Sequence, residues 1–363
     1  MNLSYSGINT KVKAMGANLI HGDEYRKIAS LDSIADFIAF LKNHPGYREI
    51  FMRYDEHELH RADVERIFIT GFYMDFSKIF RFAGESQRND LDLVFFRHEI
   101  TILKNCIRHI YNEKDTYDLS LFQEFFNRHS KIDVAALMSS HTMDEFTRHL
   151  KDTPYYPLFS RIQASGSTTP FDYEMQLDIY YFNKSWRLKD KLMKGDNLKA
   201  VEKLYGIQID LLNIMWIYRL KTMYDTNAAD ILTFTIPVNY KLSKDQLFRL
   251  VKSATTDEFL SILKNTQYKA FALFLLNGTM EQNYSKTVMK LYKENKQKYP
   301  ASMSYVNYYL YRKETEIYRL TTALECIRYG LDPQEKLKYI LHEEEPSHHS
   351  FPMEAMKRGE TID

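Results

Sequence analysis

One pattern of apolar and polar positions occurs three times along the chain. It begins at Ser33, Thr142 and Thr255 and reads Ser/Thr, two residues, Asp/Glu, Phe, three residues, Leu, Lys, then Asn/Asp. Phe and Leu four positions apart share one helix face, which predicts a short helix packed on a core. The hydroxyl residue is a typical N-cap, and the carboxylate three positions later predicts a return bond to the backbone N–H of the cap. We therefore expect three equivalent capped helices.

The apolar positions of this pattern keep the same register in every copy. They are Phe37 and Leu41, Phe146 and Leu150, and Phe259 and Leu263, preceded by Ile28, Leu137 and Leu250 and followed by Tyr47, Tyr155 and Tyr268. Phe37 and Phe146 are 109 residues apart, and Phe146 and Phe259 are 113 apart. This period is domain-sized and exceeds the roughly 20–50 residues of solenoid repeats.

A longer amphipathic segment closes each repeat, at 97–108, 210–221 and 316–328. Each has apolar residues at helical spacing, an early acid (Glu99, Asp210, Glu316) and basic residues toward its end. This order of charges suits the helix dipole, so we expect capping and the dipole to explain the repeated acids without a catalytic role. The basic residues Arg219, Lys221 and Arg328 are expected to be solvated, or alternatively to contact a partner.

The repeats predict an all-α fold of three similar helical bundles. Only 12 glycines and 9 prolines in 363 residues favour long uninterrupted helices. The predicted lobes are 1–116, 117–228 and 229–345, with one loop-like insertion at 164–170 and a disordered tail at 346–363.

Charge and cysteine content exclude several classes of protein. Lys and Arg number 49 against 48 Asp and Glu, so the net charge of +1 offers no electrostatic footprint for nucleic acid. Cys106 and Cys326 are expected to be buried thiols in a reducing compartment. The N-terminus lacks the pattern of a secretory signal, and the apolar run at 270–276 is far shorter than the about 20 residues that cross a bilayer.

The sequence offers little catalytic chemistry. GxxxxGK, GxGxxG and GxSxG motifs are absent from it, which argues against nucleotide hydrolysis and a serine nucleophile. His57 and His60 would share one helix face, and His342, His348 and His349 follow in an acidic tail. A solvated helix face and a mobile tail are the favoured interpretations, while a metal-dependent enzyme stays open as an alternative. No catalytic, cofactor-binding or metal-binding residue is assigned, and no residue is assigned to a partner contact.

At 205–224 the chain resembles the C-subunit family of the V-type/A-type ATPases (ATP synthases), whose eukaryotic counterpart is the d subunit of V-ATPase. The resemblance rests on the ordered residues Asp210, Asn213, Arg219, Lys221 and Tyr224, and it continues in 311–331 and 5–25. The first repeat departs from the pattern, because Pro45 and Gly46 precede its tyrosine and its closing segment lacks an asparagine matching Asn213.

The resemblance implies three lobes arranged pseudo-threefold as a funnel. It implies a non-catalytic connector without a cofactor or small-molecule substrate, which couples the central shaft to the membrane proteolipid ring for proton or sodium ion transport. The expected location is cytoplasmic, peripherally associated with the membrane through the ATPase complex. A helical scaffold or regulatory protein unrelated to rotary ATPases is the alternative.

Overall fold

The computed structural model describes residues 5–55, 57–112, 126, 129–166, 169–224 and 226–341, and these contain helices and no strand. The expectation of an all-α protein is confirmed over this part of the chain. None of its helices is both long and apolar enough to span a bilayer.

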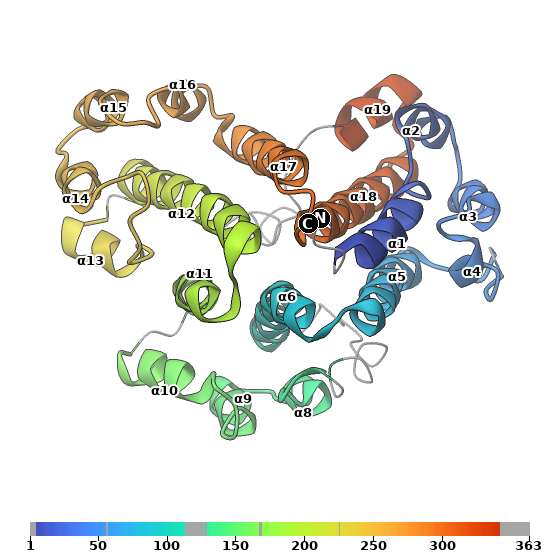
Figure 1. The fold of residues 1–363 in the computed structure, drawn as a ribbon, viewed down its shortest axis with the longest axis horizontal. Helices are drawn as coiled ribbons and strands as arrows, with labels where there is room; N and C mark the ends of the chain where they lie inside the picture. Colours follow the sequence, from blue (N-terminus) through green and yellow to red (C-terminus); the bar gives the residue numbers. More distant parts are fainter. Residues whose placement is uncertain are drawn as a thin grey trace. The chain divides into compact units, whose positions relative to one another are not determined.

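In the described residues each repeat has short helices followed by two long ones (Figure 1). After α1 (Ser6–Gly16), the first repeat has α2 (Gly22–Ala29), α3 (Ile34–Asn43), α4 (Arg48–Phe51), α5 (Arg61–Phe82) and α6 (Glu85–Tyr111). The second has α8 (Val134–Met138), α9 (Met143–His149), α10 (Tyr156–Ala164), α11 (Pro170–Leu192) and α12 (Gly195–Tyr224). The third has α13 (Ala228–Thr233), α14 (Lys244–Lys252), α15 (Thr256–Lys264), α16 (Phe271–Leu276), α17 (Met280–Lys298) and α18 (Ser304–Arg328), followed by α19 (Pro333–Leu341).

The predicted capped helices are α3, α9 and α15. Their caps Ser33, Thr142 and Thr255 each accept a hydrogen bond from the backbone N–H three residues later. The Phe and Leu of the pattern are buried in all three copies. The prediction that the carboxylate accepts from the backbone N–H of the cap is wrong. Glu145 and Glu258 accept instead from the N–H of the residue before the cap, and Asp36 accepts from the Ser33 hydroxyl.

The closing helices α6, α12 and α18 begin well before the segments that the sequence suggested. Glu99, Asp210 and Glu316 therefore lie in the middle of their helices rather than in the first turn. The helix dipole acts on charges within the first and last turns, so it does not explain these three acids. That expectation is wrong.

The described residues form two compact units, within Met1–Arg88 with Tyr292–Pro346 and within Asn89–Leu291. The boundaries 1–116, 117–228 and 229–345 stay a prediction, and residues 346–363 lie outside the described part. The insertion at 164–170 joins the end of α10 to the start of α11.

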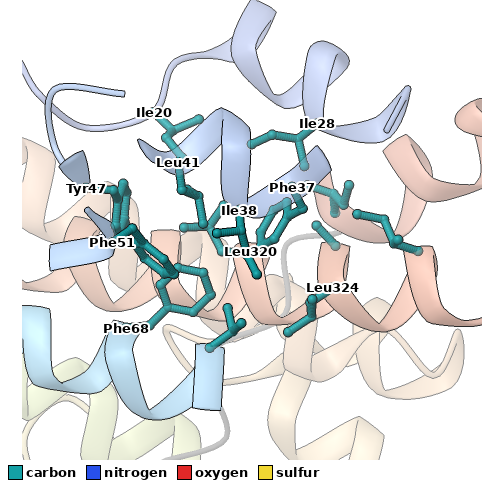
Figure 2. Packing of buried hydrophobic residues seen from close by; sticks show 14 of the residues in the cluster. Ile20, Ile28, Phe37, Ile38, Leu41, Tyr47, Phe51, Phe68, Leu320 and Leu324 are labelled. Carbon is teal, nitrogen blue, oxygen red and sulfur yellow. The ribbon is translucent and has the colours of Figure 1, made fainter. Parts of the chain in front are cut away.

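The core of the first unit joins the beginning of the chain to its last long helix. Phe37 and Leu41 of α3 pack with Phe68 of α5 and with Leu320 and Leu324 of α18 (Figure 2). The rings of Phe37 and Phe68 meet edge to face, with centroids 6.2 Å apart. Helix α18 is thus covered by the capped helix of the first repeat, although the two are far apart in sequence.

In the second unit the short helices of two repeats lie along the long ones. Helix α10 packs on α11, while α14 and α15 pack on α12 (Figure 1). Two ion pairs join α6 to α11: the buried pair Lys104 to Asp178 at 2.6 Å, and the half-buried Arg108 to the buried Glu174 through two bonds of 2.7 Å. Removing one partner of such a pair leaves a buried charge uncompensated, so these contacts fix how α6 and α11 pack.

Candidate functional site

A carboxylate from the middle of each closing helix accepts a hydrogen bond from a repeated tyrosine. The pairs, called acid–tyrosine junctions below, are Tyr155 Oη to Glu99 at 2.6 Å, Tyr268 Oη to Asp210 at 2.7 Å and Tyr47 Oη to Glu316 at 2.5 Å. Each joins a closing helix to the segment that directly follows the capped helix of the next repeat. The third joins the last closing helix to the segment after the first capped helix.

At the first junction, Glu99 accepts from the hydroxyls of Ser130 and Tyr155. The Lys184 ammonium lies 4.6 Å from the centroid of the Phe96 ring and 5.8 Å from that of Tyr155. Burial raises the pKa of Glu99, and the two hydroxyl donors and the nearby Lys184 charge oppose this shift. The carboxylate is therefore held mainly by neutral donors.

The second junction supplies four neutral donors to one buried carboxylate. Asp210 accepts from the backbone N–H groups of Tyr240, Lys241 and Leu242, at 3.3, 2.6 and 2.8 Å, besides the Tyr268 hydroxyl. Burial raises the pKa of Asp210, and all four donors act to lower it. These N–H groups belong to the loop before α14, so Asp210 fixes where that helix begins.

Asn213, one helical turn after Asp210, holds the same loop. Its Nδ2 donates to Ile236 O at 3.0 Å, and its Oδ1 accepts from Ile236 N at 2.8 Å. Gly206 lies against the ring of Tyr240, where an added Cβ would come within 2.3 Å of a ring carbon. The absence of a side chain at Gly206 thus allows the loop to approach α12 closely.

The third junction differs because a lysine takes part. Glu316 accepts from Ile20 N at 2.5 Å, from Tyr47 Oη and from Lys313 Nζ at 2.8 Å. Lys313 and Glu316 are each 3% exposed, and the ammonium also lies 4.0 Å from the centroid of the Tyr47 ring. Burial and the negative charge of Glu316 raise the pKa of Tyr47, so its hydroxyl stays a donor at neutral pH.

These junctions are suited to holding helices together rather than to catalysis. All three carboxylates are largely buried and are occupied by two to four donors, which leaves no position for a reacting group. A buried and fully satisfied polar contact specifies one arrangement of the helices that carry it. The sequence contains a signal that the three junctions are equivalent, since the three tyrosines and the three acids recur with nearly the same period, but it does not contain their pairing.

The structure does not bring the predicted histidines together as a metal site. His57 lies in a turn, and His60 is the N-cap of α5, with its N–H bonded to Asp63 at 3.0 Å. The expectation that both share a helix face is wrong. Within the described residues no group of three or more His, Cys, Asp or Glu could hold a metal ion, and His342, His348 and His349 lie outside them.

Both cysteines are free and buried, as expected. Burial raises the pKa of Cys106 to about 12 and also raises that of Cys326, so neither thiol is activated as a nucleophile.

The three basic residues at the ends of the closing helices have different surroundings. Arg219 is 9% exposed and forms an ion pair with Glu281, so the expectation of a solvated side chain is wrong there. Lys221 donates to Val251 O at 2.8 Å and lines a hollow of about 200 Å³ between the ends of α12 and α15. Arg328 is exposed and forms an ion pair with Glu325 at 3.0 Å. The hollow is lined mainly by threonines and contains no pair of nucleophile and base.

Comparison with known proteins supports the resemblance seen in the sequence. The profile of the ATP synthase (C/AC39) subunit family matches residues 8–339. The chain is 21% identical over 336 residues to the A-type ATP synthase C subunit of Thermococcus kodakarensis, covering 91% of this chain and 88% of the relative. It is 22% identical to the protein of the same name from Pyrococcus abyssi, with 93% and 90% covered, and 25% identical to that from Methanosarcina mazei, with 73% and 71% covered.

Proposed function

The chain belongs to the ATP synthase (C/AC39) subunit family, and from this premise we propose that it is the non-catalytic central-stalk connector of a V-type/A-type rotary ATPase. It binds the central shaft on one side and the membrane proteolipid ring on the other, and it transmits rotation between them during proton or sodium ion transport. It is held at the cytoplasmic face of the membrane through these partners and needs no cofactor.

The observation that carries this proposal is the set of three acid–tyrosine junctions. A part that transmits torque must resist deformation between its elements, and each junction bonds a long helix to the short helices of the following repeat. The third junction also bonds α18 to the segment before α2 through Ile20, so the first repeat is held to the last long helix. Buried polar contacts of this kind favour a single stiff arrangement.

We also propose that the three repeats form three lobes around one axis, as the family resemblance implies. Each acid–tyrosine junction would then join the closing helix of one repeat to the short helices of the next. A low-resolution solution shape with three similar lobes around an opening would support this arrangement. An elongated shape would overturn it.

Isolation from native membranes tests the function itself. A tagged chain, solubilised gently with its complex, should recover the proteolipid and the shaft subunits in fixed ratio. Its interfaces should be large, because permanent contacts typically bury on the order of 2,000 Å² or more. Recovery of neither partner would contradict the proposal and would favour the helical scaffold instead.

A further inference from the structure

Four basic side chains from three helices meet on the first unit. They are Lys13 of α1, Lys293 and Lys296 of α17, and Arg312 of α18, and they are called the cationic cluster below. They gather around two tyrosines: Lys13 Nζ is 4.4 Å from the Tyr305 ring centroid, and Lys296 Nζ is 4.0 Å from that of Tyr308. The Arg312 guanidinium carbon lies 5.8 Å from the Tyr308 centroid.

The part of the chain that the structure describes supplies no counter-charge to the cluster. Among the described residues, no carboxylate lies within ion-pair distance of any of its four cations. Nearby acids of the same unit are already occupied: Glu316 by Lys313 and Tyr47, and Asp75 by the hydroxyl of Tyr309. Helix α1 contributes two lysines and no acid.

The four charges repel one another. Burial lowers the pKa of Lys296, and the positive charges of Arg312, Lys293 and Lys13 lower it further. The chain as a whole is nearly neutral, with a net charge of +1, so this concentration of positive charge is a local feature. Cation–π contacts with Tyr305 and Tyr308 hold the side chains in place without neutralising them.

We propose that the cationic cluster is the docking site for an acidic segment of the central shaft. Carboxylates placed against these side chains would neutralise all four charges at once and relieve their repulsion. This inference rests on the proposed function, because the shaft is the partner that the function supplies.

Charge complementarity favours the shaft over the proteolipid ring. Cytoplasmic loops of membrane proteins carry an excess of Lys and Arg, and a basic loop would be repelled by the cluster. The soluble shaft is under no such restriction. An anionic lipid surface would also attract the cluster, and the experiment below separates the two.

The test compares the purified full-length chain with a charge-reversed variant, Lys13→Glu with Lys293→Glu. Both side chains are exposed and form no ion pair with any described residue, so the variant should keep the far-UV circular dichroism and thermal midpoint of the wild type. The matched control is Lys264→Glu with Lys269→Glu, two exposed lysines of the third repeat with the same change of charge. Lys13→Arg with Lys293→Arg keeps the charge.

Affinity for purified shaft subunits, for the purified ring and for phosphatidylserine-containing vesicles is measured at low and at physiological ionic strength. The charge-reversed variant should bind the shaft at least about tenfold more weakly, mainly through slower association, with ring binding unchanged. The control and the arginine variant should stay within about twofold of the wild type. Wild-type binding should weaken as salt rises, because exposed charges are screened.

Three outcomes contradict these expectations in different ways. If the wild type binds the shaft and the reversed variant binds it equally well, the docking site is wrong and the proposed function stands. If the variant instead loses only its binding to phosphatidylserine-containing vesicles, the cluster recognises lipid and the inference is also overturned. If the wild type binds neither shaft nor ring, the proposed function itself fails.

Discussion

The second and third acid–tyrosine junctions place the same two groups in contact but compensate the carboxylate differently. Asp210 is held by three backbone N–H groups and one hydroxyl, all neutral. Glu316 is held by one backbone N–H, one hydroxyl and the buried ammonium of Lys313. The position equivalent to Lys313, three residues before the acid, is Ile207 in the second repeat.

This difference shows that one repeated contact can be built with or without a second charge. Backbone donors belong to a loop whose course is fixed by Asn213 and Gly206, so the second junction depends on the fold around it. The third junction instead brings its own cation on the same helix. A buried charge pair is far more sensitive to the loss of one partner than a carboxylate surrounded by neutral donors.

The largest effect is expected when the cation of the third junction is removed. Lys313→Met should lower the free energy of unfolding by about 3–5 kcal/mol, because Glu316 stays buried without a counter-charge. The control Ile207→Met preserves volume at the equivalent position and should cost less than about 1.5 kcal/mol. Urea unfolding followed by circular dichroism measures both, and equal losses would contradict the distinction between the junctions.

The next largest effect on stability is expected from a buried acid that has no cation beside it. Asp90 of α6 is 3% exposed, and its Oδ1 has no hydrogen-bond donor among the described residues. Burial raises the pKa of Asp90 to about 7, so the folded state binds this proton more tightly than the unfolded state does. The contribution of Asp90 to stability therefore decreases as the pH rises from about 4 to about 7.

The variant Asp90→Asn removes this titration. As the pH rises from 4 to 8, the free energy of unfolding of the variant should increase relative to that of the wild type by up to about 4 kcal/mol, since each pKa unit corresponds to about 1.4 kcal/mol. Urea unfolding of both proteins across this range measures the gain. A constant difference between them at every pH would show that Asp90 does not titrate in this window.

The tyrosine hydroxyls give a smaller effect. Tyr47→Phe removes a donor to a charged group in a fully buried site and should cost about 1.5–3 kcal/mol. Tyr268→Phe should lower the free energy of unfolding by less, because Tyr268 is half-buried and Asp210 keeps its three backbone donors. Thermal unfolding of the two variants side by side checks the order, and a larger loss at Tyr268 would reverse the comparison.

The smallest effect is expected at a helix cap shared by the repeats. Thr255→Ala removes the acceptor for Glu258 N and should cost about 1 kcal/mol, while Thr255→Ser should be nearly neutral. Because α15 belongs to the helices that the second junction holds, the loss should add to that of Tyr268→Phe. Strong non-additivity in the double variant would show that cap and junction are coupled.

The capped helices could be predicted from the sequence because their signals are local. A cap, an acid and an apolar pair close together in the chain specify one short helix, and the buried Phe and Leu appear where expected. For the long helices, the pattern locates the closing ones but places their beginnings too late, and it does not predict α5, α11 or α17. Helices α6, α12 and α18 begin before the amphipathic segments on which the prediction rests, so those segments contain no cap residue that marks the start of the helix.

The junctions and the cationic cluster could not be predicted because their members are distant in sequence. Tyr47 and Glu316 are 269 residues apart, and Lys13 meets Arg312 only after α1 has packed on α18. The repeat period showed that the tyrosines and acids were equivalent, but not that each tyrosine bonds the acid of the preceding repeat. That pairing depends on how the helices pack.

Ion transport measured together with ATP hydrolysis tests the central claim most directly. Vesicles containing the complex are assembled with the chain and without it, and ATP-driven ion transport is divided by the rate of hydrolysis. If the chain connects shaft and ring, its omission should abolish transport while the catalytic head continues to hydrolyse ATP, and adding the chain back should restore the ratio. Transport that persists at the same ratio without the chain would contradict the account.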